Sequence, residues 1–131
     1  MVVDSSFVVA TLTVEQHTGA ASAFIHGRSW TGAVSLSLLN WEVGNVLRMK
    51  VKRGLATPAD RDQALSIYEQ IGFEWDDTGS RIDIMGLTDR HDLTFYDASY
   101  LELAIRRGLP LETFDNALRH AAAAEGVAVV P

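Results

Sequence analysis

Short apolar segments alternate with longer helix-like segments along the chain, and this alternation constrains the fold more than any other feature. Apolar residues spaced three and four apart predict amphipathic helices, whereas brief apolar runs predict buried strands. Strands are expected at residues 2–4, within 27–34, and at 71–75, 109–114 and 127–130. Helices are expected after Asp4 and at residues 15–26, 35–53, 57–70, 80–90, 96–107 and 115–124. This order predicts an α/β fold with a central, mainly parallel sheet flanked by helices.

The composition is typical of one globular domain, expected to span residues 1–131. Of the 131 residues, 47% are hydrophobic, and one core of this size forms without disulfides. The absence of cysteine excludes thiol chemistry and fits a cytoplasmic protein. Neither a signal peptide nor an apolar run of roughly 18 residues is visible, so we expect no membrane partner. The net charge of −6 argues against a sequence-independent DNA coat, but an acidic metal site would also lower the total.

Three aspartates follow or flank predicted strands and helix starts. Asp4 follows Val-Val, Asp115 follows the strand expected at 109–114, and Asp97 lies where the helix at 96–107 begins. In open parallel sheets, ligands bind outside the carboxyl ends of the strands, where helix N-termini also converge. We therefore expect the three carboxylates to share one edge of the sheet. Each of them also fits the simpler role of a helix N-cap.

Glu42 lies on or beside the apolar stripe of the helix expected at 35–53. It follows Leu38 by four residues and precedes Val46 by four. An unpartnered buried carboxylate costs several kcal/mol, so Glu42 must be paired, protonated or metal-bound. The alternative is a glutamate at the edge of the stripe that reaches water or an arginine.

Four carboxylates in one cleft would repel one another strongly unless cations neutralise them. Oxygen ligands without histidine or cysteine favour Mg²⁺ or Mn²⁺ over zinc. One or two such ions support in-line attack of water on a phosphodiester. The acids therefore indicate a metal-dependent phosphodiesterase chemistry.

Four segments together resemble the PIN-domain ribonucleases, and among them the VapC-type toxins of bacterial toxin–antitoxin pairs. They are residues 2–6 (Val-Val-Asp-Ser-Ser), 38–47 (Leu-Leu-Asn-Trp-Glu-Val-Gly-Asn-Val-Leu), 96–104 (Tyr-Asp-Ala-Ser-Tyr-Leu-Glu-Leu-Ala) and 109–118 (Leu-Pro-Leu-Glu-Thr-Phe-Asp-Asn-Ala-Leu). Each motif alone is weak, but four in order and at about the expected spacings are specific, and the resemblance covers nearly the whole chain.

The resemblance implies a PIN fold and a Mg²⁺- or Mn²⁺-dependent endonuclease that cleaves RNA. The acids of the family fall on Asp4, Glu42, Asp97 and Asp115. We expect the three aspartates to hold one or two ions, and Glu42 to complete the site or orient water.

Three neutral residues beside the acids are expected to support them. They are Ser5, Thr113 and Asn116. Thr113 matches the Ser/Thr of the family two residues before the last acid. Asn116 stands where some relatives carry a further acid, which leaves the number of ions open.

The resemblance also implies partners. Relatives dimerise and are silenced by a cognate VapB-type antitoxin, whose own DNA-binding part links the pair to its promoter. We expect such an antitoxin, a homodimer, and contact with DNA only through the antitoxin. The helix at 57–70 is expected to be exposed, but the sequence does not identify the dimer interface. The RNA target is not encoded in any motif.

Two other functions compete with this interpretation. A signalling receiver domain is also an acidic α/β protein that binds Mg²⁺, but it requires an acidic pair after the first strand and a late lysine, and no lysine follows Lys52. A catalytically silent PIN scaffold is the second alternative, and the presence of all four acids argues against it.

Cations and tryptophans give weaker signals for RNA binding. Arg48, Lys50, Lys52 and Arg53 fall within six residues and either steer a phosphate backbone or complement a helix C-terminus. The tryptophans either stack on bases or belong to the core; they are Trp30, Trp41 and Trp75.

Overall fold

The computed structural model describes residues 1–13 and 29–131. Its five short strands form one parallel sheet in the order β3-β2-β1-β4-β5. The helix expected at 15–26 lies outside the described residues. The strands are β1 (Val2–Val3), β2 (Val34–Ser35), β3 (Glu74–Trp75), β4 (Leu111–Glu112) and β5 (Val129–Val130).

The strand β1 lies at the centre of the sheet, with Val2 opposite Val34 of β2 on one side and Leu111 of β4 on the other. The chain winds outward from β1 through β2 to β3, then crosses over to β4 and β5. The predicted α/β fold with a parallel sheet is therefore confirmed. In sheets of this kind, ligands bind at the carboxyl ends of the strands where the winding reverses, which here is between β1 and β4.

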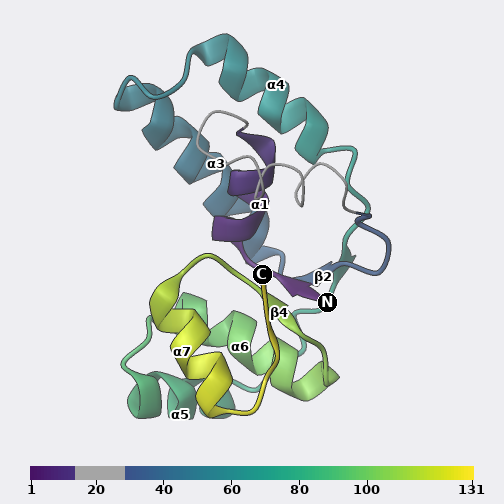
Figure 1. Ribbon diagram of the computed structural model, residues 1–131, viewed down its shortest axis with the longest axis vertical. Helices are drawn as coiled ribbons and strands as arrows, with labels where there is room; N and C mark the ends of the chain where they lie inside the picture. The colour runs from purple at the N-terminus through teal and green to yellow at the C-terminus, as the bar shows by residue number, and fades with distance from the viewer. Residues whose placement is uncertain (14–28) are drawn as a thin grey trace.

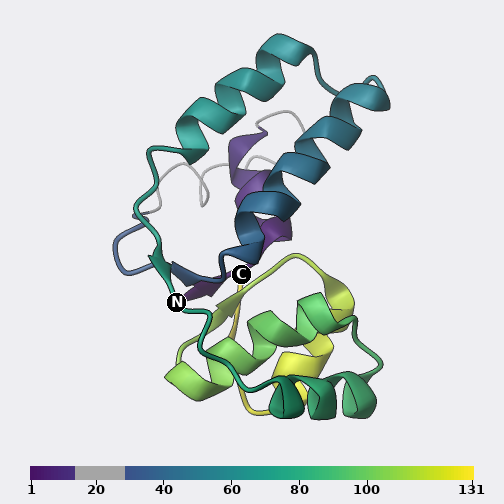
Figure 2. The ribbon, with the colours of Figure 1, turned by 180° about the vertical axis from the view of Figure 1, so that it is seen from behind.

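Helices cover both faces of the sheet, as the two opposite views in Figures 1 and 2 show. One group lies on one face and a second group on the other. The first group is α1 (Ser5–Leu12), α3 (Leu38–Lys52) and α4 (Pro58–Tyr68). The second group is α5 (Arg81–His91), α6 (Phe95–Arg107) and α7 (Asn116–Ala124).

Each face of the sheet has its own hydrophobic core. Successive residues of a strand point to opposite faces. Val3 accordingly packs with Phe7 and Leu39 of the first helical group. Val2 packs with Leu101 and Leu118 of the second group. The two-residue strand β1 therefore joins two cores, and its carboxyl end lies where they meet.

Local sequence signals explain several helix ends. Thr57 and Asp60 form a reciprocal capping box at the start of α4, and Pro58 occupies its first turn. Gly54 and Gly108 follow α3 and α6 with positive φ angles of 73° and 61°, a backbone region that favours glycine. These predicted boundaries are confirmed.

The strands are shorter than the sequence suggests, and one helix starts differently. The strand expected at 109–114 is confined to Leu111–Glu112. The one expected within 27–34 is Val34–Ser35, so Ser35, expected to begin a helix, belongs to β2, and α3 begins at Leu38. Thr94, rather than an aspartate, caps α6, and this places Asp97 within the first turn of that helix. None of the helices described here is long and apolar enough to span a membrane.

Candidate active site

Asp4 is buried at the carboxyl end of β1, with only 4% of its surface exposed. One carboxylate oxygen, Oδ1, accepts the backbone N–H of Phe7 at 2.9 Å and so caps α1. The hydroxyl of Ser6 also donates to Oδ1, at 2.8 Å. Burial raises the pKa of Asp4 to about 6, although the hydrogen bonds from Thr113, Phe7 and Ser6 oppose this rise. Asp4 is therefore the N-cap of α1, and its buried carboxyl also has a raised pKa.

Two hydroxyl groups connect the ends of β1 and β4. Thr113, fully buried after β4, donates from Oγ1 to Asp4 Oδ2 and accepts the backbone N–H of Asp115 at 3.0 Å. Ser6 Oγ accepts the backbone N–H of Phe114 at 2.9 Å. These contacts fix the loop that carries Asp115 against the loop that carries Asp4. Asp115 caps α7 by accepting the Leu118 N–H at 2.7 Å.

Glu42 projects from α3 and is held by hydroxyls rather than by an arginine. Tyr100 of α6 donates to Glu42 Oε1 at 2.6 Å, and Ser5 of α1 donates to Oε2 at 3.4 Å. Burial is the main cause that raises the pKa of Glu42; the Tyr100 hydrogen bond lowers it, and the charge of Asp97 raises it further. The expectation that this carboxylate is partnered is confirmed.

Asp97 lies in the first turn of α6, half-buried, and its backbone N–H donates to the Thr94 hydroxyl at 3.1 Å. The N-cap role considered for Asp97 is wrong, because Thr94 fills it. Burial raises the pKa of Asp97, the Thr94 hydroxyl lowers it, and the charge of Asp115 raises it. The start of α6 therefore positions Asp97, but Asp97 does not cap this helix.

Asp97 is the electrostatic link among the four acids. Its charge adds to burial in raising the pKa of Asp4 and of Glu42, and Asp115 acts on Asp97 in the same sense. Like charges disfavour ionisation only when they lie near one another. The fold thus brings residues from β1, α3, α6 and the end of β4 to one acidic site.

The donor chemistry of this site fits a hard divalent cation. The side chains offer only oxygen atoms, which Mg²⁺ and Mn²⁺ prefer. A cation would relieve the charge repulsion that adds to burial in raising the pKa of Asp4, Glu42 and Asp97. Within residues 1–13 and 29–131, however, no three His, Cys, Asp or Glu side chains are arranged closely enough to hold an ion. The charges of the four acids therefore affect one another, although no three of their carboxylates are close enough to coordinate one ion in the described residues.

The three neutral residues expected to support the acids differ in the hydrogen bonds that they form. Thr113 contacts Asp4 directly, and Ser5 reaches Glu42. Asn116 begins α7 with an exposed side chain, and its backbone carbonyl accepts from His120 at 2.7 Å. No hydrogen bond joins the Asn116 side chain to the four acids in the described part of the chain.

Sequence reasoning missed three residues that shape the site. Ser6 bridges Asp4 and Phe114, Tyr100 holds Glu42, and Thr94 caps the helix that carries Asp97. A usable signal existed for Tyr100, because it follows Asp97 by three residues and so lies on the same side of α6. No signal in the sequence distinguishes Ser6 from Ser5, since either hydroxyl can turn inward.

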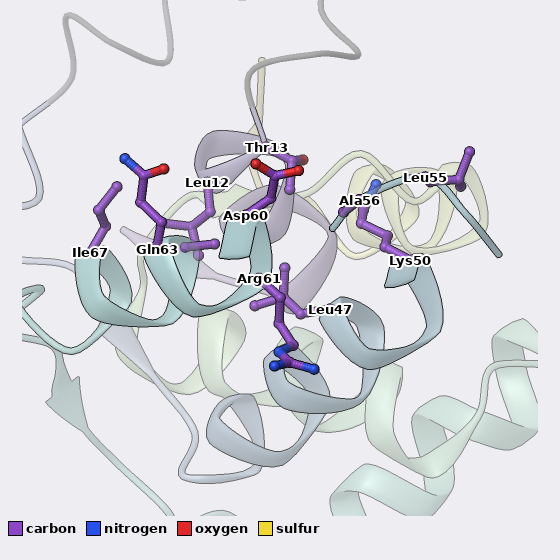
Figure 3. A pocket seen from close by; sticks show the side chains of 11 residues that line it. Leu12, Thr13, Leu47, Lys50, Leu55, Ala56, Asp60, Arg61, Gln63 and Ile67 are labelled. Atoms are coloured by element: carbon purple, nitrogen blue, oxygen red, sulfur yellow. The ribbon is translucent and has the colours of Figure 1, made fainter. Parts of the chain in front are cut away.

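A separate pocket lies between α1, α3 and α4, away from the acids (Figure 3). Its lining mixes apolar side chains such as Leu12, Leu47 and Ile67 with charged ones such as Lys50 and Arg61. None of the predicted site residues lines it. The hollow therefore belongs to the packing of the first helical group rather than to the acidic site.

Comparisons with known proteins agree with this architecture. None of the curated proteins compared is similar enough to this chain to count as a match. The crystal structure of PAE2754 from Pyrobaculum aerophilum is similar with a TM-score of 0.72 and 25% identity, covering 98% of this chain and 89% of that chain. That of FitAcB from Neisseria gonorrhoeae is similar with a TM-score of 0.68 and 15% identity, covering 99% and 96% respectively.

The family comparison decides between the folds considered above. A family model described as PIN domain matches residues 1–124. This match also removes the receiver-domain alternative, which requires a different family. The chain belongs to the PIN-domain family.

Proposed function

We propose that this protein is a metal-dependent endoribonuclease whose active site consists of Asp4, Glu42, Asp97 and Asp115. The observation that supports the proposal is the mutual charge interaction of these four carboxylates, two of which, Asp4 and Asp115, follow the strands between which the winding of the sheet reverses. PIN domains are generally nucleases, and the family match covers all four residues. A site that concentrates negative charge needs a cation before it can approach a phosphodiester.

In this proposal the three aspartates bind Mg²⁺ or Mn²⁺. The ion supplies positive charge that acidifies a water molecule and stabilises the phosphoryl oxygens during in-line attack. Thr113 and Ser6 hold Asp4 in position, and the N-terminus of α7 fixes Asp115.

Glu42 would orient the attacking water and receive its proton. The Tyr100 hydroxyl holds Oε1 at 2.6 Å, whereas Ser5 is 3.4 Å from Oε2. Oε2 is therefore the better acceptor for a proton. The raised pKa of Glu42 strengthens it as a base.

We further propose that the protein is a VapC-type toxin, silenced by a cognate VapB-type antitoxin and active as a homodimer. The four motifs and their spacing support this finer assignment. Contact with DNA would occur only through the antitoxin.

A catalytically silent PIN scaffold remains the second candidate. It is favoured by the one observation that, in the described residues, no three acids are arranged closely enough to hold an ion. The two proposals differ in whether the purified chain cleaves RNA.

The test is cleavage of total bacterial RNA by the purified, partner-free chain with Mg²⁺ or Mn²⁺. Parallel samples contain EDTA, the Asp97→Asn variant, or the Asp92→Asn variant. Asp92 is a matched control, because it follows α5 in the left-handed region, which asparagine tolerates, and forms no hydrogen bond or salt bridge with the four acids in the described chain. Discrete cuts lost with EDTA and Asp97→Asn but kept with Asp92→Asn support the proposal. Cleavage by folded Asp97→Asn at the wild-type rate would overturn that residue's role.

A further inference from the structure

One face of α3 carries four exposed polar or aromatic residues in a straight line. Spacings of four, three and four residues place them within about 60° of one another around the helix. The opposite face buries Leu39, Val43 and Leu47 in the core. We call these four residues the α3 stripe: Trp41, Asn45, Arg48 and Lys52.

Trp41 differs from the other two tryptophans of the chain. Trp30 packs edge-on against Phe73 with ring centroids 5.8 Å apart, and Trp75 lies 5.3 Å from the same ring. Trp41 is 72% exposed and makes no ring contact within residues 1–13 and 29–131. A large aromatic surface left in water on a rigid helix is a stacking platform.

Trp41 lies at the same level of α3 as Glu42, with its side chain about 100° further round the helix. It directly precedes Glu42, and Leu38, one turn earlier, lines a shallow hollow together with Tyr96. Tyr96 is 60% exposed and directly precedes Asp97. Each of these two exposed aromatic residues is therefore the chain neighbour of one of the four carboxylates.

The far end of the α3 stripe is cationic. Arg48 and Lys52 form no salt bridge with any residue of the described chain, whereas Arg90, Arg106 and Arg107 are neutralised by acids. Lys52 lies about 16 Å along the helix from Trp41, since each residue advances about 1.5 Å. In a chain with a net charge of −6, this leaves two uncompensated cations on the same face of α3 as Trp41.

We propose that an unpaired segment of an RNA strand binds along the α3 stripe, with one base stacked on Trp41 and its phosphates beside Arg48 and Lys52. This inference rests on the proposed nuclease function and assigns the surface that would receive its RNA substrate. The stripe would direct the neighbouring phosphodiester to Glu42 and the aspartates. A duplex would bind poorly, because its bases are already stacked on one another and cannot splay onto an aromatic ring.

The test is binding of a labelled single-stranded RNA of roughly 12 nucleotides, with Mg²⁺, to the Asp97→Asn protein and to variants made in that background. We expect Trp41→Phe to retain most of the affinity while abolishing quenching of tryptophan fluorescence by RNA. Trp41→Leu keeps apolar bulk without an aromatic face, and it should weaken binding roughly tenfold. The same RNA annealed into a duplex should bind more weakly than the single strand to the parent protein.

A matched pair of arginines tests the cationic track. Arg48→Ala should lower the slope of log affinity against log salt by about 0.7, the value for one phosphate contact on a single strand. Arg53→Ala removes the same charge from the end of the same helix, about 120° away from the stripe, and should leave the slope unchanged. Equal effects of the two variants would mean a bulk charge effect and would overturn the inference.

Two outcomes separate this inference from the nuclease proposal. In one outcome, wild-type protein cleaves RNA with Mg²⁺, but Trp41→Leu and Arg48→Ala do not change the RNA affinity of the Asp97→Asn protein. The nuclease proposal then stands, and the α3 stripe is not the surface that binds the RNA. If light scattering shows that the stripe variants dissociate a dimer without changing RNA affinity, the surface joins two copies and the inference fails. Absence of RNA binding to the parent also overturns it.

Discussion

The Tyr100 hydroxyl donates a hydrogen bond of 2.6 Å to Glu42 Oε1 and thereby joins α6 to α3 beside the three aspartates. Tyr100 is 1% exposed, so its ring is fixed by the core and cannot follow the carboxylate if Glu42 moves. The hydrogen bond lowers the pKa of Glu42, against the larger effect of burial, which raises it. The position and the basicity of Glu42 therefore both depend on Tyr100.

Replacing Tyr100 by phenylalanine should slow RNA cleavage roughly tenfold or more, because Glu42 loses the contact that orients it. The pKa of Glu42 should rise further, since the hydrogen bond that lowers it is gone. The acidic limb of the rate–pH profile should consequently move to higher pH. Tyr68→Phe is the control, because the Tyr68 hydroxyl binds Asn40 at 2.8 Å and not one of the acids. An unshifted profile in Tyr100→Phe would remove Glu42 from the proton-accepting role.

Replacing Asp4 by asparagine should stabilise the metal-free protein at alkaline pH while abolishing cleavage. Burial raises the folded-state pKa of Asp4 from 3.8 to about 6. Folding is therefore favoured by the protonated form, and this contribution is complete below pH 3.8 and lost as the pH rises through about 6. The loss amounts to about 3 kcal/mol, since one pKa unit equals about 1.4 kcal/mol.

The measurement is urea unfolding in EDTA at about pH 5 and about pH 8, where the wild type should lose more stability than Asp4→Asn on going to the higher pH. Glu42 and Asp97 have pKa values shifted in the same direction and remain in both proteins, so the comparison removes their own contributions and leaves that of Asp4 together with its charge interaction with Asp97. Parallel pH dependences for the two proteins would contradict the account of Asp4 as a destabilising buried charge.

Addition of Mg²⁺ or Mn²⁺ should stabilise the folded protein, because an ion that binds only the folded state shifts the unfolding equilibrium. At a concentration of about 100 times Kd the gain is about 2.7 kcal/mol. Thermal unfolding of wild type, Asp97→Asn and Asp92→Asn with and without metal measures this gain. We expect it in wild type and Asp92→Asn and not in Asp97→Asn. A similar gain in all three proteins would place the ion elsewhere.

Asp76 should prove more important for stability than any exposed acid. It accepts hydrogen bonds from Arg106 at 2.9 Å and from Arg107 at 2.8 Å, and so anchors the last turn of α6 to the loop after β3. The Arg106 contact is the largest cause that holds the pKa of Asp76 far below its usual range. Its contribution to stability is therefore present above its usual pKa and is lost as the pH falls below that value.

Asp76→Ala should lower the free energy of unfolding by about 2 kcal/mol, because it leaves two arginines without their shared partner. Asp62→Ala is the matched control, since Asp62 also pairs with an arginine, Arg61, but its side chain is 66% exposed. Urea unfolding near neutral pH should separate the two variants. Equal effects would mean that the Asp76 contacts add no more than a surface pair.

The alternation of apolar segments was sufficient to predict the parallel sheet, because strand and helix patterns differ in period and each was repeated several times. Strand lengths were not predictable: an apolar run such as 109–114 continues past the two residues that pair in β4. The cap of α6 was misassigned, since Thr94 and Asp97 both favour a helix start, and the choice depends on where the preceding turn ends.

The candidate site was predictable only as a set of acids. Asp4, Glu42, Asp97 and Asp115 could be selected because their sequence contexts resemble a family pattern and place carboxylates at helix starts or on an apolar stripe. Their supporting hydroxyls could not, because Ser6 and Tyr100 act through contacts made across the sheet. Such contacts depend on tertiary packing rather than on local periodicity.

The joining of two cores by a two-residue central strand has a consequence for biosynthesis. Asp4 leaves the ribosome well before Thr113 and Asp115, which lie near the end of the matched region, residues 1–124. Asp4 cannot receive the Thr113 hydroxyl until β4 has inserted beside β1. A nascent chain that has folded only its first helical group therefore lacks half of the acids, and the site cannot form before α6 and β4 have been made.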